Sequence, residues 1–200
     1  MNASAALIPT PAPSLDAGAR LRARSRAIGV LVFAGFGGLW AAGGATLSSA
    51  PAWAWLVIAT LVLAFGVRAV RLLRANPAVT EPLPADIAAR RRRAGRIFLW
   101  TNVAEVLGIL LAVNLVVNLG RPQWQTAAVM ATVGLHFLPL AVGFGYRPHL
   151  VTGVAMTAWA LAYPALFAAG GMAPAGSFGA AAILFASAAW ALRSVPAVGR

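Results

Sequence analysis

Long apolar runs separated by short polar breaks dominate the chain. Six runs approach membrane-spanning length, because a helix needs about 20 mostly apolar residues to cross a bilayer. They cover residues 27–46, 52–70, 97–119, 124–145, 150–169 and 177–192. The pattern predicts an all-α fold, a multi-pass transmembrane helical bundle with six spanning helices in residues 27–193.

The segments outside the runs are predicted to be tails and turns. Residues 1–26 combine prolines and small residues with four arginines and read as a disordered basic tail, and residues 194–200 form a C-terminal tail. A signal peptide is the alternative for the first run, with Ala50-Pro51-Ala52 as a cleavage site. Its apolar core would span only about 7–15 residues, so we favour a retained helix.

One connection is long and basic. Residues 71–96 contain three prolines and a block of arginines, and they cannot lie in hydrocarbon. Asp86 is predicted to cap a helix that continues through the arginines into the third span. We expect this loop to contact anionic lipid headgroups through Arg90, Arg91, Arg92, Arg93 and Arg96.

The arginines also predict the orientation of the bundle. In the six-helix arrangement the N-terminal tail contributes four arginines, the long connection and its flanks eight, the 146–149 turn one and the C-terminal end two. Fifteen of the sixteen therefore fall on one side, and only Arg121 falls opposite. The positive-inside rule then places both termini and the long loop in the cytoplasm, and the protein in the cell membrane.

Composition narrows the function classes. Sixty per cent of the residues are apolar and ten per cent charged, with a mean hydropathy of +0.80, which a water-soluble domain does not have. The net charge of +12 is predicted to meet the lipid bilayer and no nucleic acid. There is no cysteine and there are two histidines, and the sequence has no nucleophile–base motif or phosphate loop. We therefore expect no cofactor, no metal site and no enzymatic activity.

Two titratable residues are predicted to share one depth in the membrane. Glu105 lies eight residues into the third span, about 12 Å deep at 1.5 Å per residue. His136 lies nine residues before the end of the antiparallel fourth span, about 13–14 Å deep. An intramembrane carboxylate normally faces the bundle interior with a partner, and His136 is the candidate partner.

Asn102 completes the candidate polar site, about 60° around the third helix from Glu105. Two interpretations stay open. The pair could exchange a proton or hold a polar substrate group. It could equally form a structural hydrogen bond between two helices.

The fourth run contains Gly134-Leu135-His136-Phe137-Leu138-Pro139-Leu140. This stretch resembles a loose group of small bacterial six-helix membrane proteins with a Gly-x-His-Phe-x-Pro-Leu-like fourth helix. The resemblance implies a bacterial cytoplasmic membrane and no established activity.

Two functions therefore remain as hypotheses. The protein is either a small transporter with a Glu/His site near the midplane, or a noncatalytic subunit that packs against a second copy of itself or a membrane-protein partner. A water-accessible cavity at the pair would favour the transporter, and a dry contact the subunit.

Overall fold

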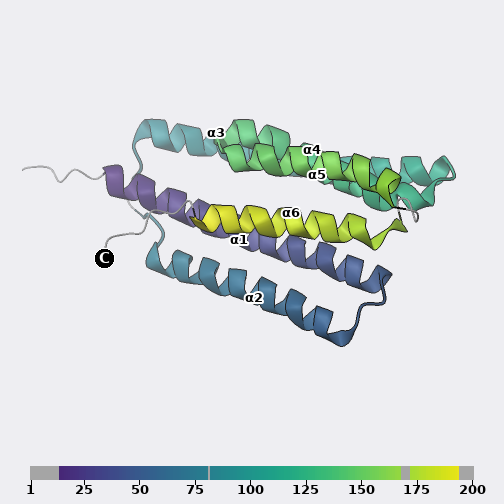
Figure 1. Ribbon diagram of the computed structural model, residues 1–200. Helices are drawn as coiled ribbons and strands as arrows, with labels where there is room; N and C mark the ends of the chain where they lie inside the picture. Colours follow the sequence, from purple (N-terminus) through teal and green to yellow (C-terminus); the bar gives the residue numbers. More distant parts are fainter. Residues whose placement is uncertain (1–13, 81, 168–171, 194–200) are drawn as a thin grey trace, which may run out of the picture.

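Six long helices make up the protein. The computed structural model describes residues 14–80, 82–167 and 172–193, and within them there is helix and turn but no strand (Figure 1). The helices are α1 (Ser14–Leu47), α2 (Ala52–Ala75), α3 (Ala85–Asn118), α4 (Gln125–Phe144), α5 (Arg147–Leu166) and α6 (Pro174–Arg193), with a 3-10 turn, η1 (Pro122–Trp124), before α4. All six are long and apolar enough to cross a membrane, which confirms the predicted fold class.

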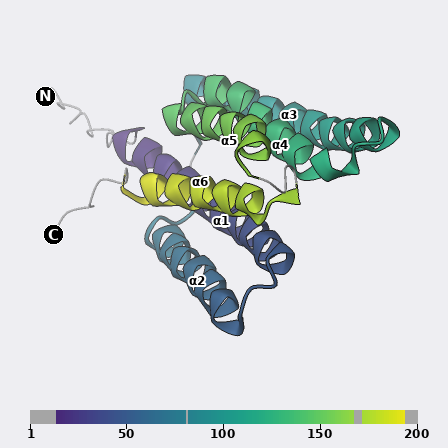
Figure 2. The same cartoon turned by 45° about the vertical axis from the view of Figure 1, so that its right-hand side comes forward.

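The helices pack mainly as a row, in which α1 also meets α4 and α5 through Phe33. Each contacts its neighbours in the order α2, α1, α6, α5, α4, α3, so that α2 and α3 form the two edges (Figure 2). The edge helices bury one residue each, Ala69 in α2 and Thr101 in α3. Their remaining surface carries large apolar side chains such as Leu63 and Leu111, which are about two-thirds exposed at 67% and 70%. Such a surface suits lipid or other apolar helices, so this is a multi-pass membrane protein.

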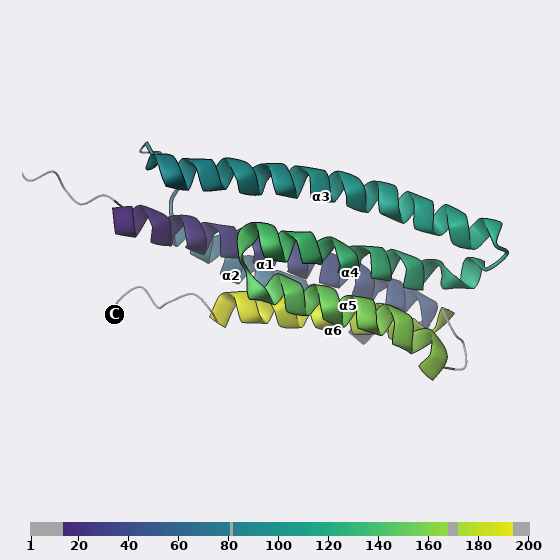
Figure 3. The ribbon, with the colours of Figure 1, turned by 90° about the horizontal axis from the view of Figure 1, so that it is seen from above.

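Two helices are much longer than the bilayer requires. α1 and α3 have 34 residues each, about 51 Å at 1.5 Å per residue, against a hydrocarbon thickness of about 30 Å. Their first turns project beyond the ends of α4, α5 and α6 (Figure 3). The projecting turns carry arginines from both helices, so these charges reach past the apolar layer.

The predicted disorder of residues 1–26 is wrong from Ser14 onward. Residues 14–26 belong to α1, because alanine, leucine and arginine favour helix and the segment continues without a break into the apolar run. Residues 1–13 lie outside the described part of the chain, as does the predicted tail at 194–200.

The long connection is shorter than predicted. α2 continues to Ala75 and α3 begins at Ala85, so only residues 76–84 link them. The predicted helix through the arginines is confirmed, but the predicted cap at Asp86 is wrong. Pro84 is the N-cap residue and makes no side-chain cap bond. Asp86 lies inside the first turn of α3. Nη2 of Arg90, one turn further on, donates to the carboxylate of Asp86 over 3.2 Å.

An arginine of α1 ties down the end of α2. Nη1 of Arg24 donates to the carbonyl oxygen of Asn76 over 2.8 Å, and Nδ2 of Asn76 donates to the carbonyl oxygen of Leu72 over 2.9 Å. A cation at a helix C-terminus is favoured by the helix dipole and by the unpaired carbonyl groups there. This contact fixes the point from which the 76–84 link departs.

The last two helices begin earlier than predicted. α5 starts at Arg147 rather than residue 150, because Pro148 occupies its first turn, where a missing N–H is harmless. α6 starts at Pro174 rather than residue 177 for the same reason. The predicted end of the fifth span at residue 169 lies outside the described residues.

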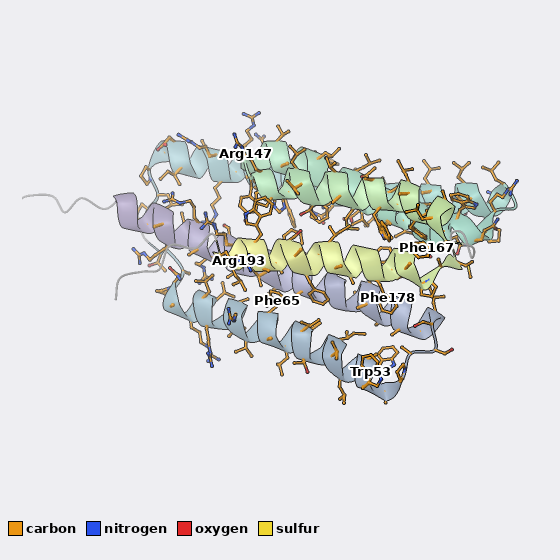
Figure 4. The ribbon with its side chains drawn as sticks, viewed as in Figure 1. Trp53, Phe65, Arg147, Phe167, Phe178 and Arg193 are labelled. Carbon is orange, nitrogen blue, oxygen red and sulfur yellow. The ribbon has the colours of Figure 1, made fainter. Side chains whose placement is uncertain are left out.

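The described arginines gather at one end of the bundle. Arg147 and Arg193, at the start of α5 and the end of α6, lie toward that end, and Trp53 lies at the other (Figure 4). The arginines of α1, α2 and α3 lie in the parts of those helices nearest the same end. Among the described arginines, Arg121 alone lies opposite, next to η1.

Candidate functional site

Glu105 and His136 meet between α3 and α4. Oε2 of Glu105 lies 3.3 Å from Nδ1 of His136. The side chain of His136 is 8% exposed and that of Glu105 20% exposed, so the contact is largely shielded from its surroundings. The structure therefore brings together the two titratable residues that the sequence places at one depth.

A second oxygen identifies the hydrogen on the imidazole ring. Nδ1 of His136 also lies 3.3 Å from the carbonyl oxygen of Thr101, one turn before Glu105 on α3. A carbonyl oxygen can only accept, so we assign the hydrogen to Nδ1, which donates toward both oxygens. The imidazole thus bridges the backbone and a carboxylate of the same helix, which fixes the register of α4 on α3.

Small residues let the two helices approach on either side of this contact. A β-carbon on Gly143 would lie 2.7 Å from Cγ2 of Ile97, and one on Gly108 would lie 2.9 Å from Cγ2 of Thr132. Both distances are shorter than a real contact allows. Glycine at these two positions therefore brings α3 close enough to α4 for the two side chains to touch.

Asn102 is not joined to the pair. Its side-chain nitrogen donates to the carbonyl oxygen of Phe98 on its own helix over 2.7 Å. The side-chain nitrogen of Asn114 likewise donates to the carbonyl oxygen of Leu110 over 2.7 Å. In an apolar medium an exposed amide satisfies its donors most easily on the preceding turn. The polar contact consequently involves Glu105, His136 and the Thr101 carbonyl.

An aromatic cluster lies next to His136 toward the arginine end. The ring of Phe137 meets His136 edge-on at 5.4 Å and stacks on His149 of α5 at 5.8 Å. The remaining members of this cluster, all within 6 Å of the His149 ring centroid, are Phe33, Phe144 and Tyr146. Sequence reasoning placed His149 in a turn and missed this role. The signal available was the density of aromatic residues between 137 and 149.

Tyr146 and His149 each keep a polar atom without a partner in the described part of the chain. These atoms are the hydroxyl of Tyr146 and Nδ1 of His149. Tyr146 lies in the turn between α4 and α5, and burial raises the pKa of its phenol, an effect that the positive charge of Arg26 opposes. The phenol therefore stays neutral at physiological pH.

Backbone contact joins α4 to α5 behind the pair. A β-carbon on Gly134 would lie 2.7 Å from the backbone nitrogen of Thr157 and 3.0 Å from the carbonyl oxygen of Gly153. One on Gly153 would lie 2.8 Å from the carbonyl oxygen of Gly134. The glycine of the Gly134–Leu140 motif thus serves close helix packing, two residues before His136.

Polar bonds tie α5 to α6 in turn. The hydroxyls of Thr152 and Ser187 share a buried hydrogen bond of 2.7 Å. Nε1 of Trp159 donates to the carbonyl oxygen of Gly176 over 3.1 Å, and the ring of Tyr163 lies over the same glycine. Trp159 and Tyr163, which share a face of α5, are therefore used in packing, with their ring centroids 6.1 Å apart.

The arginine block lies on the surface at the start of α3. All five predicted headgroup ligands are exposed: Arg90, Arg91, Arg92, Arg93 and Arg96. Arg92 and Arg96 border a depression of about 570 Å³ with Ala89, Gly95 and Leu99. The position suits contact with lipid headgroups, which stays a prediction.

The two described cavities lie away from the Glu105–His136 contact. The depression beside Arg96 lies nearer the start of α3, and a second cavity lies near Arg121 at the other end, and neither is lined by the pair. Within residues 14–80, 82–167 and 172–193, no three histidine, aspartate or glutamate side chains gather as metal ligands would. The contact itself lies in the seam between α3 and α4.

The resemblance of the Gly134–Leu140 stretch to a group of small membrane proteins stays a prediction. Comparison with protein-family models, curated proteins and solved structures finds no match for this chain.

Proposed function

We propose that the protein is a noncatalytic subunit of a membrane complex, held in the cytoplasmic membrane with its arginine-rich end in the cytoplasm. The observation that carries the proposal is the position of α2 and α3 at the edges of the bundle, where each packs on one main neighbour. A transporter site near the membrane midplane lines a cavity that the substrate can reach. Here the pair sits in a seam between adjacent helices, 8% and 20% exposed, and lines neither described cavity.

In this proposal the edge helices form the contact surfaces. α3 presents Leu107 and Leu111, 60% and 70% exposed, and α2 presents Leu56 and Leu63, 70% and 67% exposed. The seam contact of Glu105 with His136 holds α3 in one register on α4, so that its outer face is presented in a single orientation. The arginines at the start of α3 lie beside that face and suit an acidic segment of a partner or anionic headgroups.

Site-specific crosslinking tests this function. A photoreactive amino acid at Leu107 or Leu63 should crosslink to one stoichiometric protein, another membrane protein or a second copy, that copurifies in mild detergent. The matched control is the same amino acid at Val142 of α4, which is 85% exposed and lies on neither edge helix. Equal labelling from all three positions, or lipid adducts alone on a monomeric protein, would contradict the proposal.

One observation favours a second candidate, a proton-coupled carrier. Glu105 and His136 are titratable, touch at 3.3 Å and lie on membrane-spanning segments. Proton flux into liposomes that contain the purified protein distinguishes the two candidates. Proton flux driven by a potassium diffusion potential, present in the wild type and abolished by Glu105→Gln, would replace the subunit proposal with the carrier.

A further inference from the structure

Arg121 is held in a fixed place at the end of the bundle opposite the other described arginines. α3 ends in a Schellman turn, in which Gly120 takes a φ of +66° that favours glycine. The backbone nitrogen of Gly120 donates to the carbonyl oxygen of Val117 over 2.9 Å, and that of Arg121 to Val116 over 2.8 Å. η1 then starts from this turn, with the nitrogen of Trp124 donating to the Arg121 carbonyl over 3.0 Å. These hydrogen bonds fix the backbone of Arg121 at the end of α3.

An apolar cavity of about 460 Å³ lies directly beside this arginine. It is formed by the end of α3, by η1 and by α4 and α5, and its lining is Val116, Leu119, Arg121, Trp124, Ala127, Ala128, Ala131, Ala160 and Leu161. The alanines of α4 and α5 leave the space, because larger side chains there would fill it. Its volume is within the range of ligand pockets, about 300–1,000 Å³.

The rim of the cavity faces the membrane. Leu119 and Leu161 are 65% and 72% exposed, and Trp124 is 41% exposed. An indole at the end of a spanning helix belongs at the headgroup level, so the cavity begins at the interface and extends along α4 toward Ala131. Ala131 is the sixth residue after Gln125, where α4 starts, and so lies about 9 Å along the helix from that end.

The guanidinium of Arg121 is free to meet a ligand. It is exposed and has neither a hydrogen bond nor an ion pair with any described residue. The described acidic residues lie elsewhere, Asp16 and Asp86 in the first turns of α1 and α3 and Glu105 in the α3–α4 seam. The cavity thus joins an unpaired positive charge at the interface to an apolar slot below it.

We propose that this cavity, a groove open to the surrounding lipid, binds one acyl chain of an anionic phospholipid, with the lipid phosphate paired to Arg121. The apolar slot matches the chain, the guanidinium matches the phosphate, and both lie at the depths that these two parts occupy in a bilayer. The inference is independent of the subunit proposal, because the groove lies at the η1 end of the α3–α4–α5 packing and neither Leu107 nor Leu63 lines it.

Photolabelling in liposomes tests the site. Phosphatidylglycerol with a diazirine in one acyl chain should label the segment 127–131 and Leu161, and matched phosphatidylcholine should label them about fivefold less, since one arginine near the surface favours an anionic lipid by about that factor. Arg121→Gln should bring the ratio of the two lipids close to one. Ala131→Phe should reduce labelling by both lipids, because the ring fills the slot.

Val142→Phe is the control, since it adds the same ring to α4 at an 85% exposed position outside the groove. Equal labelling of 127–131 by both lipids in the wild type would overturn the proposal, and so would labelling that Ala131→Phe leaves unchanged. A crosslink from the segment to a second copy would show that another protein occupies the groove, which also overturns it. The comparison of the two lipids on the wild-type protein decides the matter even where a variant fails to fold.

Discussion

Replacement of Gly134 by valine should separate α4 from α5 and lower the free energy of unfolding by about 3 kcal/mol or more. The β-carbon alone would lie 2.7 Å from the Thr157 nitrogen and 3.0 Å from the Gly153 carbonyl oxygen. Both are backbone atoms of a helix, so they cannot turn aside as a flexible side chain could. Denaturation of the purified protein in mixed detergent micelles measures the loss.

Gly66→Val is the matched control for this effect. Nothing lies within 4 Å of a β-carbon built at Gly66 in the middle of α2, and valine is at least as good a helix residue as glycine. Its free energy of unfolding should therefore stay within about 1 kcal/mol of the wild type. If the two variants unfold alike, the close approach of α4 and α5 at Gly134 is not real.

Replacement of His136 by leucine should lower the free energy of unfolding by about 1–3 kcal/mol. The carboxyl group of Glu105, 3.3 Å from Nδ1 in the native protein, would lose its partner in a setting where only 20% of that side chain is exposed. Glu105→Gln keeps an oxygen acceptor for the imidazole hydrogen and should cost less than His136→Leu. The same denaturation assay measures both.

A double-mutant cycle separates the pair from its surroundings. The cycle compares Glu105→Leu, His136→Leu and the double variant with the wild type. The double variant removes both polar groups, so it should lose less free energy of unfolding than the two single variants together, with a coupling energy of about 0.6–2 kcal/mol. A coupling near zero would mean that the two side chains do not interact. The cycle concerns stability alone, so its result is independent of the function proposed for the pair.

The sequence predicted the six helices well because long apolar runs have few alternatives in lipid. Each backbone N–H and C=O group must be satisfied within its own segment, which leaves helix as the conformation for a run such as 97–119. Depth was equally predictable, since a helix rises by a constant amount per residue. Glu105 and His136 could therefore be placed at one level before any contact was known.

Neighbours and boundaries were less predictable. The helix formed by 14–26 lacks an apolar run, and its extension depends on continuity with the span that follows. The order of the helices in the row depends on where small residues permit close approach, as at Gly134 and Gly153, and periodicity alone does not pair them. Asn102 looked like a partner of Glu105 from its angle on α3, but its own helix offered the nearer acceptor, the Phe98 carbonyl.

The aromatic cluster was missed for a related reason. Phe33 of α1, Phe137 of α4 and His149 of α5 come from three different helices, and their contact depends on the tertiary packing. The groove beside Arg121 depends in the same way on four separate segments. Features of this kind follow from the arrangement of helices, which the pattern of one chain specifies only in part.

The six helices are proposed to cross the membrane with the arginine-rich end in the cytoplasm, and the accessibility of introduced thiols tests this orientation. The chain has no cysteine, so single cysteines can be introduced without altering a background. Thr80→Cys lies in the 76–84 link at the arginine end, and Ser48→Cys lies in the α1–α2 turn at the other. In intact cells a membrane-impermeant maleimide should label Ser48→Cys, and it should label Thr80→Cys only after permeabilisation. Labelling of Thr80→Cys in intact cells would show that the arginine-rich end lies outside the cytoplasm.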